Sequence, residues 1–297
     1  MLVDTHCHLN FKAFKHDSSE VVARAKEAGV VSIINVGSQW STSVRGVRMA
    51  EKGEGLFASV ALHPIHLYEM EVDEDEDHFT TKAEVFGYEK YKVLANSSSK
   101  VVAIGECGLD YYHWPGGVDR AEVKIMQQEL FRQHINLASE LNLPIIIHCR
   151  SEKPERASNQ QGAGRDAYGD LLVILKNELA KGKLSKKGVA HCFLGRKEQA
   201  KRFLDLGFLL SFTGIITFKN ASPELLEIVK QTPFNKIMVE TDAPYLAPQA
   251  YRGTRNEPAY VAEVAKKIAE LKDVSFEEVK RITTQNADQL FSLGIIK

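Results

Sequence analysis

The sequence repeats one unit: a short run of branched apolar residues, then a segment with helical periodicity, then another apolar run. Residues 30–36 (VVSIINV) form one such run. Near-continuous apolar runs are typical of strands covered on both faces, as in parallel sheets. Segment 119–141 shows the other half of the unit, because Leu130 and Leu141 fall on one face of a helix there. This alternation predicts a parallel β/α architecture.

About eight such units follow one another along the 297 residues. The predicted strands cover residues 2–8, 30–36, 56–62, 101–104, 144–147, 189–193, 208–212 and 236–239. Two further helices are predicted at 258–271 and 276–291, and no low-complexity linker or internal repeat interrupts the pattern. Eight strand and helix units over this length predict a single (β/α)8 TIM barrel that comprises residues 1–297.

The charge and the N-terminal segment limit the possible classes of function. The formal net charge is −1, which argues against an extensive basic surface for nucleic acid, although metal ions in a cleft can still bring phosphates there. The first apolar segment reaches a histidine at position 6, which leaves no room for a secretory signal. No apolar run approaches the roughly 20 residues that span a bilayer. We therefore expect a cytoplasmic protein that does not enter membranes.

Each of the four cysteines follows directly on a histidine or a glutamate, as His6-Cys7, Glu106-Cys107, His148-Cys149 and His191-Cys192. None has CxxC spacing, so a disulfide framework or a cysteine-type zinc site is not expected. Neighbouring residues in a strand point to opposite faces. If the polar residue points inward, the thiol points outward and packs against the helices as a small apolar group.

His6 and His8 stand two apart at the end of the first predicted strand, so they face the same side. Such a pair alone is more often a surface or hydrogen-bonded feature than a metal site. Other polar residues, however, stand at the carboxyl ends of the predicted strands: His63, Glu106, His148, His191 and Asp242. Barrel enzymes keep their active sites on that rim. Imidazoles and carboxylates suit Zn, Mn or Mg, and there are enough of them for two ions, which predicts metal-assisted hydrolysis.

Seven short motifs resemble, in order, the signatures of the TatD-like metal-dependent deoxyribonuclease family. They are Asp4-Thr5-His6-Cys7-His8-Leu9, Ala61-Leu62-His63-Pro64, Gly105-Glu106-Cys107-Gly108-Leu109-Asp110-Tyr111-Tyr112, Ile147-His148-Cys149-Arg150, His191-Cys192-Phe193, Glu240-Thr241-Asp242-Ala243-Pro244-Tyr245-Leu246 and Arg252-Gly253-Thr254-Arg255-Asn256-Glu257-Pro258. The resemblance extends from residue 4 to residue 258. It implies a DNA substrate, single-stranded DNA or DNA ends, and exonuclease action from the 3′ side.

The same resemblance implies a ligand set. His6, His8 and Asp242 would hold a first divalent ion, His148 and His191 a second, and Glu106 would bridge the two. Asp242 is also the candidate to accept a proton from the attacking water, so Asp242 and Glu106 are the expected catalytic residues. No obligate protein partner is expected.

Four further residues suit a phosphodiester substrate. Arg150 follows a proposed ligand by two positions and so faces the same pocket, and its guanidinium group matches phosphate oxygens. Arg252 and Asn256 lie in the loop after the eighth strand. His63 is expected to donate a hydrogen bond to a phosphate oxygen or to contact a nucleotide. All four are predicted to bind substrate, with surface or supporting roles as the alternative.

Some polar residues and segments receive a structural interpretation. His134 lies one turn from Leu130, so we expect it to pack between helices. Asp110 is expected either to orient the Glu106 loop or to line the substrate groove. The acidic stretch 69–77 is expected to be a solvated loop or helix edge, and the polar segment 151–169 a mobile loop.

Two other functions remain open. A small-molecule metallohydrolase that opens lactones, amides or phosphotriesters could use the same barrel. In that branch a lysine on the fourth strand is a common alternative to Glu106, so Glu106 and the 240–246 run argue against it. A non-catalytic metal-binding scaffold is the second alternative, and the complete ligand set argues against it.

Overall fold

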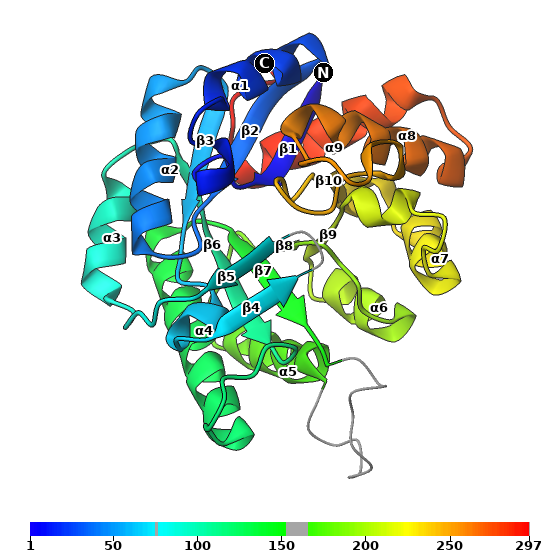
Figure 1. Cartoon of the computed structure of the whole chain (residues 1–297). Coiled ribbons are helices and arrows are strands. Elements are labelled where there is room, and N and C mark those ends of the chain that lie inside the picture. Colours follow the sequence, from blue (N-terminus) through cyan, green and yellow to red (C-terminus); the bar gives the residue numbers. More distant parts are fainter. Residues whose placement is uncertain (75–76, 153–165, 297) are drawn as a thin grey trace.

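Eight parallel strands pair side by side in the computed structural model, which describes residues 1–74, 77–152 and 166–296 (Figure 1). Their order in the sheet follows the chain: β1 (Leu2–Cys7), β2 (Val30–Val36), β3 (Leu56–Val60), β6 (Val101–Asp110), β7 (Ile145–Arg150), β8 (Gly188–Ala190), β9 (Leu209–Phe212) and β10 (Ile237–Val239). Helices alternate with these strands, so the predicted (β/α)8 barrel is confirmed.

The barrel closes between its first and last strands without a regular ladder among the described residues. Cys7 and Ala243 form an isolated parallel bridge. The His8 amide donates to the Ala243 carbonyl over 2.8 Å, and the Asp242 amide donates to the His6 carbonyl over 2.9 Å. We call this junction of β1 with β10 and the residues that follow it the seam. It brings His6 of β1 and His8, which directly follows β1, beside Asp242, more than 230 positions away.

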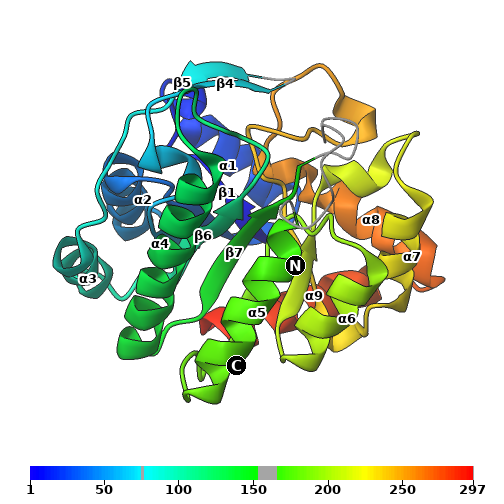
Figure 2. The same cartoon turned by 90° about the horizontal axis from the view of Figure 1, so that it is seen from below.

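The helices surround the sheet (Figures 1 and 2). They are α1 (Ser18–Glu27), α2 (Trp40–Lys52), α3 (Tyr88–Asn96), α4 (Arg120–Leu141), α5 (Ala167–Ala180), α6 (Lys197–Asp205), α7 (Pro223–Gln231), α8 (Val261–Lys272) and α9 (Phe276–Phe291). Side chains cap the amino-terminal ends of two of these helices. Asp119 accepts a hydrogen bond from the Ala121 amide at the start of α4, and Ser275 accepts one from the Glu278 amide at the start of α9. Such caps satisfy amides that lack a partner within the helix. None of the helices in the described ranges has the length and apolarity needed to cross a membrane.

Alternation along the strands separates two apolar layers. On β7, Ile145 and Ile147 belong to the cluster between sheet and helices, whereas Ile146 belongs to a second cluster inside the barrel. Leu290 and Phe291 of α9 also belong to the inner cluster, so α9 closes the amino-terminal end of the barrel. His148 continues the face of Ile146 two residues later, and it therefore points into the barrel at the other end.

Two segments differ from the sequence-based expectation. Part of the acidic stretch 69–77 forms β4 (Glu71–Glu74), which pairs antiparallel with β5 (Asp77–Thr80) in register Val72 with Phe79. Val72 is buried, so an apolar side chain within the acidic run anchors a hairpin where a solvated loop was expected. In Figure 2 this hairpin lies at one end of the molecule and α9 at the other. Most of the predicted mobile loop, residues 153–165, lies outside the described residues.

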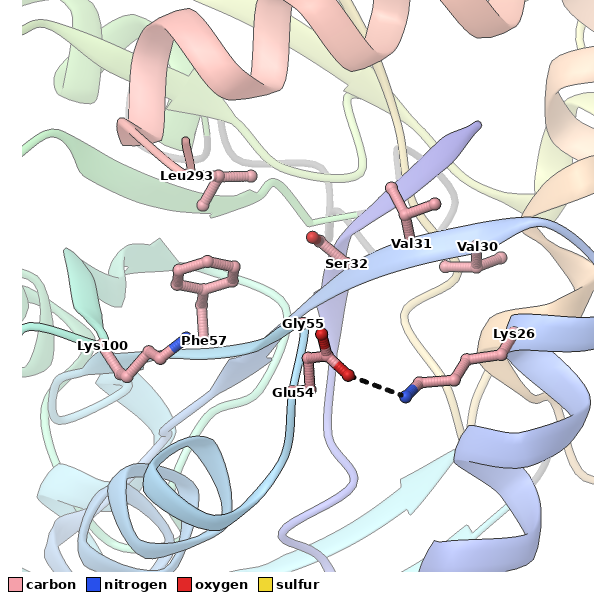
Figure 3. A pocket seen from close by; sticks show the side chains of 9 residues that line it. All are labelled: Lys26, Val30, Val31, Ser32, Glu54, Gly55, Phe57, Lys100 and Leu293. Carbon is pink, nitrogen blue, oxygen red and sulfur yellow. Dashed lines mark ion pairs between the residues drawn. The ribbon is translucent and has the colours of Figure 1, made fainter. Parts of the chain in front are cut away.

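A cavity of about 420 Å³ lies at the amino-terminal ends of β2 and β3 (Figure 3). Val31, Phe57 and Leu293 supply apolar lining, and Lys26 pairs with Glu54 at its edge over 4.0 Å. None of the predicted ligands lines this cavity. The predicted chemistry belongs to the opposite end of the barrel.

Candidate metal centre

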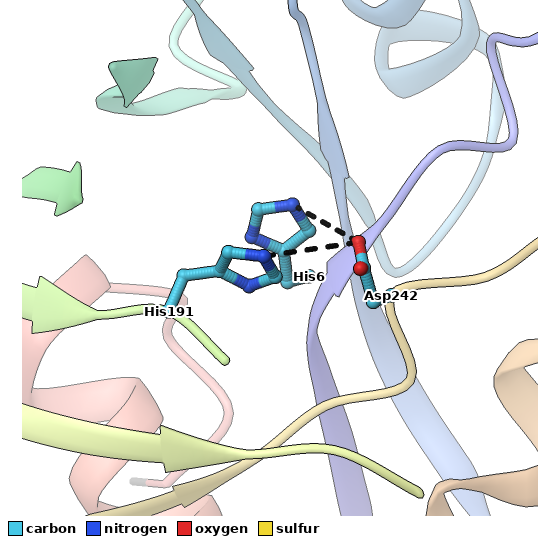
Figure 4. A group of neighbouring side chains, drawn as sticks. All are labelled: His6, His191 and Asp242. Atoms are coloured by element: carbon cyan, nitrogen blue, oxygen red, sulfur yellow. Dashed lines mark ion pairs between the residues drawn. The ribbon is translucent and has the colours of Figure 1, made fainter. Parts of the chain in front are cut away.

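Two histidines and a carboxylate meet at the seam. The Nε2 atoms of His6 and His8 are 3.2 Å apart. Asp242 Oδ1 lies 3.6 Å from His6 Nε2 and 3.4 Å from His8 Nε2. Both histidines are buried, and the Asp242 side chain is 15% exposed, so the group opens toward solvent on the Asp242 side. Figure 4 shows His6 and Asp242 with His191 beside them.

Glu106 lies between this group and a second one. Its Oε2 is 3.4 Å from His6 Nε2 and 3.7 Å from His8 Nε2. Its Oε1 faces the other way, 2.9 Å from His148 Nδ1 and 3.6 Å from His191 Nε2. One carboxylate therefore presents one oxygen to each group. Glu106 reaches this place because β6 continues to Asp110, well past the predicted end at residue 104.

The remaining ring nitrogens indicate which atoms could bind a cation. His8 Nδ1 lies 3.0 Å from the Val36 carbonyl oxygen, His148 Nε2 3.0 Å from Asp110 Oδ2, and His191 Nδ1 2.8 Å from Glu240 Oε1. The Val36 carbonyl and Asp110 Oδ2 each accept a ring N–H, from His8 and His148 respectively, which leaves the lone pair of the other nitrogen directed into the centre. Metal-ligating histidines are held in this way. His191 Nδ1 lies beside Glu240 as an ion-pair contact without a hydrogen bond. The donor set of nitrogens and carboxylate oxygens therefore fits divalent ions such as Zn, Mn or Mg.

Charges within the centre shift its acids and bases strongly. Burial raises the pKa of Glu106, but its electrostatic interactions with the His63 and His6 imidazoles and its hydrogen bond with His148 outweigh burial and hold that pKa well below its usual range. Burial lowers the pKa of His191, but the negative charges of Glu240, Asp242 and Glu106 outweigh it and raise the pKa to about 10. The carboxylates thus favour positive charge at this position.

His63 stands beside the second group in a different state. Its Nε2 is 3.4 Å from Glu106 Oε1, and its Nδ1 accepts the Ile65 amide over 3.3 Å. Burial and the positive charge of His148 lower the pKa of His63 to about 4, so the ring is neutral at pH 7. Because Nδ1 accepts a hydrogen bond, the proton sits on Nε2. In this tautomer His63 offers the centre a donor rather than a ligand.

Three carboxylates support the ligands from behind, and each is no more than 1% exposed: Asp4, Asp110 and Glu240. Asp110 Oδ1 accepts the backbone amides of Tyr112 and His113, while its other oxygen faces His148. The structure thus gives Asp110 the orienting role. All three stand two or four residues from a ligand on the same strand or turn, and that period-two spacing is the sequence signal by which they could have been found.

Asn256 was expected to bind substrate, and the structure contradicts this. Its side chain is fully buried, and its Nδ2 donates to the carbonyls of Thr241 and Tyr245. Its Oδ1 accepts the Glu257 amide. An amide that serves three backbone groups in the interior has no surface left for a phosphate. The sequence pattern could not distinguish this role, because Asn suits both.

The two predicted substrate-binding arginines lie against aromatic rings. The Arg150 guanidinium carbon is 3.8 Å from the centroid of the Tyr112 ring, and that of Arg252 is 4.5 Å from the Phe218 ring. Stacking of this kind holds a guanidinium group in a fixed plane while its N–H groups remain at the edge. Contact of these arginines with substrate stays a prediction.

Three of the four thiols have the predicted surroundings. Cys7, Cys107 and Cys149 are buried in the apolar cluster between sheet and helices. Cys192 is partly exposed, and its Sγ lies 3.4 Å from Thr213 Oγ1. The prediction is wrong there because β8 ends at Ala190, so strand alternation no longer governs residue 192. His134 packs as expected, with Nε2 accepting the Leu62 amide and Nδ1 facing the Leu130 carbonyl.

Comparison with known proteins agrees with this geometry. Residues 3–292 match the family described as TatD related DNase. The chain is 41% identical over 294 residues to the metal-dependent hydrolase YabD of Bacillus subtilis (strain 168), and the aligned region covers 99% of this chain and 100% of YabD. It is 35% identical over 295 residues to the metal-dependent hydrolase YcfH of Escherichia coli (strain K12), and the aligned region covers 98% of this chain and 96% of YcfH.

A solved structure extends the agreement to the fold. The crystal structure of YjjV, a TatD homologue from Escherichia coli K12, superposes with a TM-score of 0.80 at 29% identity and covers 98% of both chains. The sequence match, the shared barrel and the cluster of histidines and carboxylates agree with one another. The chain therefore belongs to the TatD-related DNase family and is a metal-dependent hydrolase.

Proposed function

We propose that this protein hydrolyses phosphodiester bonds of DNA, in single strands or at strand ends, with two divalent ions. The observation that carries the proposal is the position of Glu106, whose two oxygens face two separate groups of nitrogen ligands. A carboxylate with this placement suits a bridge between two ions. The family description as DNase supports DNA as the substrate. Exonuclease action from the 3′ side is part of the proposal because the resemblance of the motifs to this family implies it.

In this proposal His6, His8 and Asp242 hold one ion, His148 and His191 hold the other, and Glu106 belongs to both. Bound divalent ions lower the pKa of a water and stabilise charge on the attacking and leaving oxygens. Asp242 is partly exposed, and its carboxylate accepts the proton of the attacking water and passes it toward the leaving oxygen.

The charge of the buried acids supports two ions rather than one. Four carboxyl groups surround the centre: Glu106, Asp110, Glu240 and Asp242. A fifth, Asp4, lies behind the ligands, and burial raises its pKa to about 8, although its hydrogen bonds with Thr241 oppose the rise. Two divalent cations carry four positive charges, which match the four carboxylates. A buried centre is most stable when its charges are compensated.

Substrate contacts follow from the donors at the rim. The neutral His63 ring directs its Nε2–H toward the centre, where it donates to a phosphate oxygen. Arg150 lies on the same face of β7 as His148 and contacts the same phosphodiester. Arg252 contacts the DNA strand further from the metal centre.

We also propose a cytoplasmic location and action without an obligate protein partner.

The test uses metal-stripped protein reloaded with Mg²⁺, Mn²⁺ or Zn²⁺ and single-stranded DNA labelled at its 5′ end. We expect stepwise shortening from the 3′ end, which a 3′ phosphorothioate linkage blocks. Asp242→Asn should reduce the rate about 100-fold or more, because it removes a ligand and a proton acceptor. Asp205→Asn, on an exposed aspartate of α6 that pairs with Lys201, is the control and should leave the rate unchanged.

Matched arms with RNA, a phosphotriester and a lactone test the alternatives. If no divalent ion supports DNA cleavage while the phosphotriester or the lactone turns over, the nuclease proposal fails and the small-molecule function replaces it. Cleavage of DNA with random internal cuts would retain the nuclease and remove the 3′ exonuclease component.

A further inference from the structure

Asp242 has a backbone conformation that is uncommon for residues other than glycine. Its φ is 59°, in the left-handed region. Outside glycine this region is sparsely populated, because the Cβ atom approaches the following carbonyl group. Surrounding structure must therefore hold the residue there. The conformation matters because it directs the Asp242 carboxylate to His6 and His8 across the seam.

Asp4 holds the residue before Asp242 from one side. Its Oδ1 accepts the Thr241 amide over 2.9 Å, and its Oδ2 accepts the Thr241 hydroxyl over 2.6 Å. The same Oδ1 lies 3.3 Å from the His6 amide, which donates to it. One fully buried carboxyl group thus links a ligand on β1 to the residue that precedes a ligand on the other side of the seam.

Asn256 holds the same segment from the other side. Its Nδ2 donates to the carbonyl oxygen of Thr241 over 2.9 Å and to that of Tyr245 over 2.6 Å. Its backbone amide donates to the Pro244 carbonyl over 3.0 Å. These carbonyls lie on both sides of Asp242 in the sequence, so a single buried amide group fixes both ends of the turn that carries the ligand.

We propose that Asp4 and Asn256 act as a clamp on Thr241 that holds Asp242 in its left-handed conformation and so completes the ligand group of His6, His8 and Asp242. Both are positioning residues. Asp4 contacts the backbone of His6 rather than its ring, and Asn256 is fully buried behind the turn. The inference rests on the proposed metal function and assigns the clamp to one of the two ions.

The clamp makes a prediction that separates the two ligand groups. Neither Asp4 nor Asn256 hydrogen-bonds to the side chain of His148 or His191 among the residues that the structure describes. Loss of the clamp should therefore lower the affinity for the first ion and leave the affinity for the second ion unchanged. Removing a supporting hydrogen bond from a ligand typically lowers metal affinity about 10–100-fold, and we expect an effect of that size for Asn256→Ala.

The chain offers a matched control for general destabilisation. Asn286 on α9 is also buried, and its Nδ2 donates to the carbonyls of Phe234 and Ile237, both over 2.7 Å. It therefore makes the same pair of bonds, but at the amino-terminal end of β10 instead of the seam. Asn286→Ala should lower the melting midpoint by a similar amount and leave both ions bound as in the parent.

A second pair of variants keeps the test independent of any folding defect in Asn256→Ala. Thr241→Val has nearly the same shape but cannot donate to Asp4, whereas Thr241→Ser keeps the hydroxyl. We expect Thr241→Val to lose affinity for the first ion and Thr241→Ser to retain it. This recovery by the conservative variant is a result that loss of packing alone would not give.

The experiment titrates metal-free protein with Mn²⁺ alone and reads the stoichiometry and both affinities by calorimetry. The proposal predicts two ions in the parent and in the variants Asn286→Ala and Thr241→Ser. Asn256→Ala and Thr241→Val should bind the first ion about 10–100-fold more weakly. Equal loss in the two Asn→Ala variants, unchanged binding in Asn256→Ala, or a parent that binds no Mn²⁺ would overturn it. If the parent binds two ions as predicted but cleaves no DNA, the proposed nuclease fails and the clamp stands.

Discussion

The variant Asp110→Asn tests how the second ligand group is oriented. In the parent, Asp110 Oδ1 accepts the backbone amides of Tyr112 and His113, over 3.0 and 2.9 Å, and Oδ2 faces His148 Nε2 over 3.0 Å. Asparagine has one acceptor oxygen and one donor nitrogen. Because two amides point at the Oδ1 position, the asparagine oxygen must occupy it, and its NH₂ group must face His148.

That arrangement inverts the tautomer of the ligand. An NH₂ group that donates to His148 Nε2 makes this nitrogen an acceptor, so the ring proton moves to Nδ1. Nδ1 faces Glu106 over 2.9 Å and is the atom whose lone pair a cation would need. Asp110→Ala removes the carboxylate without imposing a donor, and the ring remains free to use either tautomer. The asparagine variant should therefore bind the second ion more weakly than the alanine variant, although asparagine is the closer mimic.

The size of the effect follows from the bonds involved. Loss of an orienting partner lowers metal affinity about 10–100-fold, which corresponds to roughly 1.4–2.8 kcal/mol. Reversing the tautomer forfeits about one further hydrogen bond, or roughly 1 kcal/mol. We expect a loss of about 10-fold for Asp110→Ala and about 100-fold for Asp110→Asn.

The assay is a Zn²⁺ titration of each variant against a coloured chelator, with the first ion as an internal reference. Circular dichroism establishes that the variants fold. If Asp110→Asn binds the second ion as well as the parent does, or better than Asp110→Ala, the tautomer argument is refuted.

Two further predictions concern stability. Cys7→Ser should lower the free energy of unfolding by about 1–3 kcal/mol, because it places a hydroxyl in an apolar layer, and it should leave the metal content unchanged; lost metal would show that the faces of β1 are assigned wrongly. Burial of Glu178 raises its pKa, but the hydrogen bonds and charges of Lys181 and Lys183 outweigh burial and lower the pKa from 4.5 to about 2. Glu178→Gln should cost about 2 kcal/mol in urea denaturation at pH 7. The difference from the parent should persist down to about pH 4.5 and shrink toward pH 2, and a difference independent of pH would contradict this assignment.

The barrel was predictable because its signals are local. Near-continuous apolar runs such as 30–36 mark buried strands, and helical periodicity marks the segments between them. Polar residues at strand ends then share a rim by topology alone, which is why the histidines and acids of the centre could be named before their distances were known. The resemblance to the family added their division into two groups.

What could not be predicted depends on contacts that leave no periodic trace. The hairpin β4–β5 was not predicted, because acidic residues surround the buried valine within it, Val72. The end of β6 was placed too early because Gly105 and Gly108 disguise a strand as a turn. A Cβ at Gly108 would lie 1.9 Å from the His148 carbonyl oxygen, so glycine there permits close strand pairing. Asn256 was misassigned because its partners, Thr241 and Tyr245, are carbonyl groups that any residue provides.

The seam also determines when the first ligand group can exist during synthesis. Its two histidines are made before the other proposed ligands, whereas Asp242 follows more than 230 residues later and Asn256 later still. No local segment contains this group, and contacts over such sequence separations form late, since the intervening chain must be ordered first. A nascent chain can therefore assemble the pair His148 and His191 before it can assemble the group at the seam. The order of the strands along the chain therefore determines the order in which the two ligand groups can assemble.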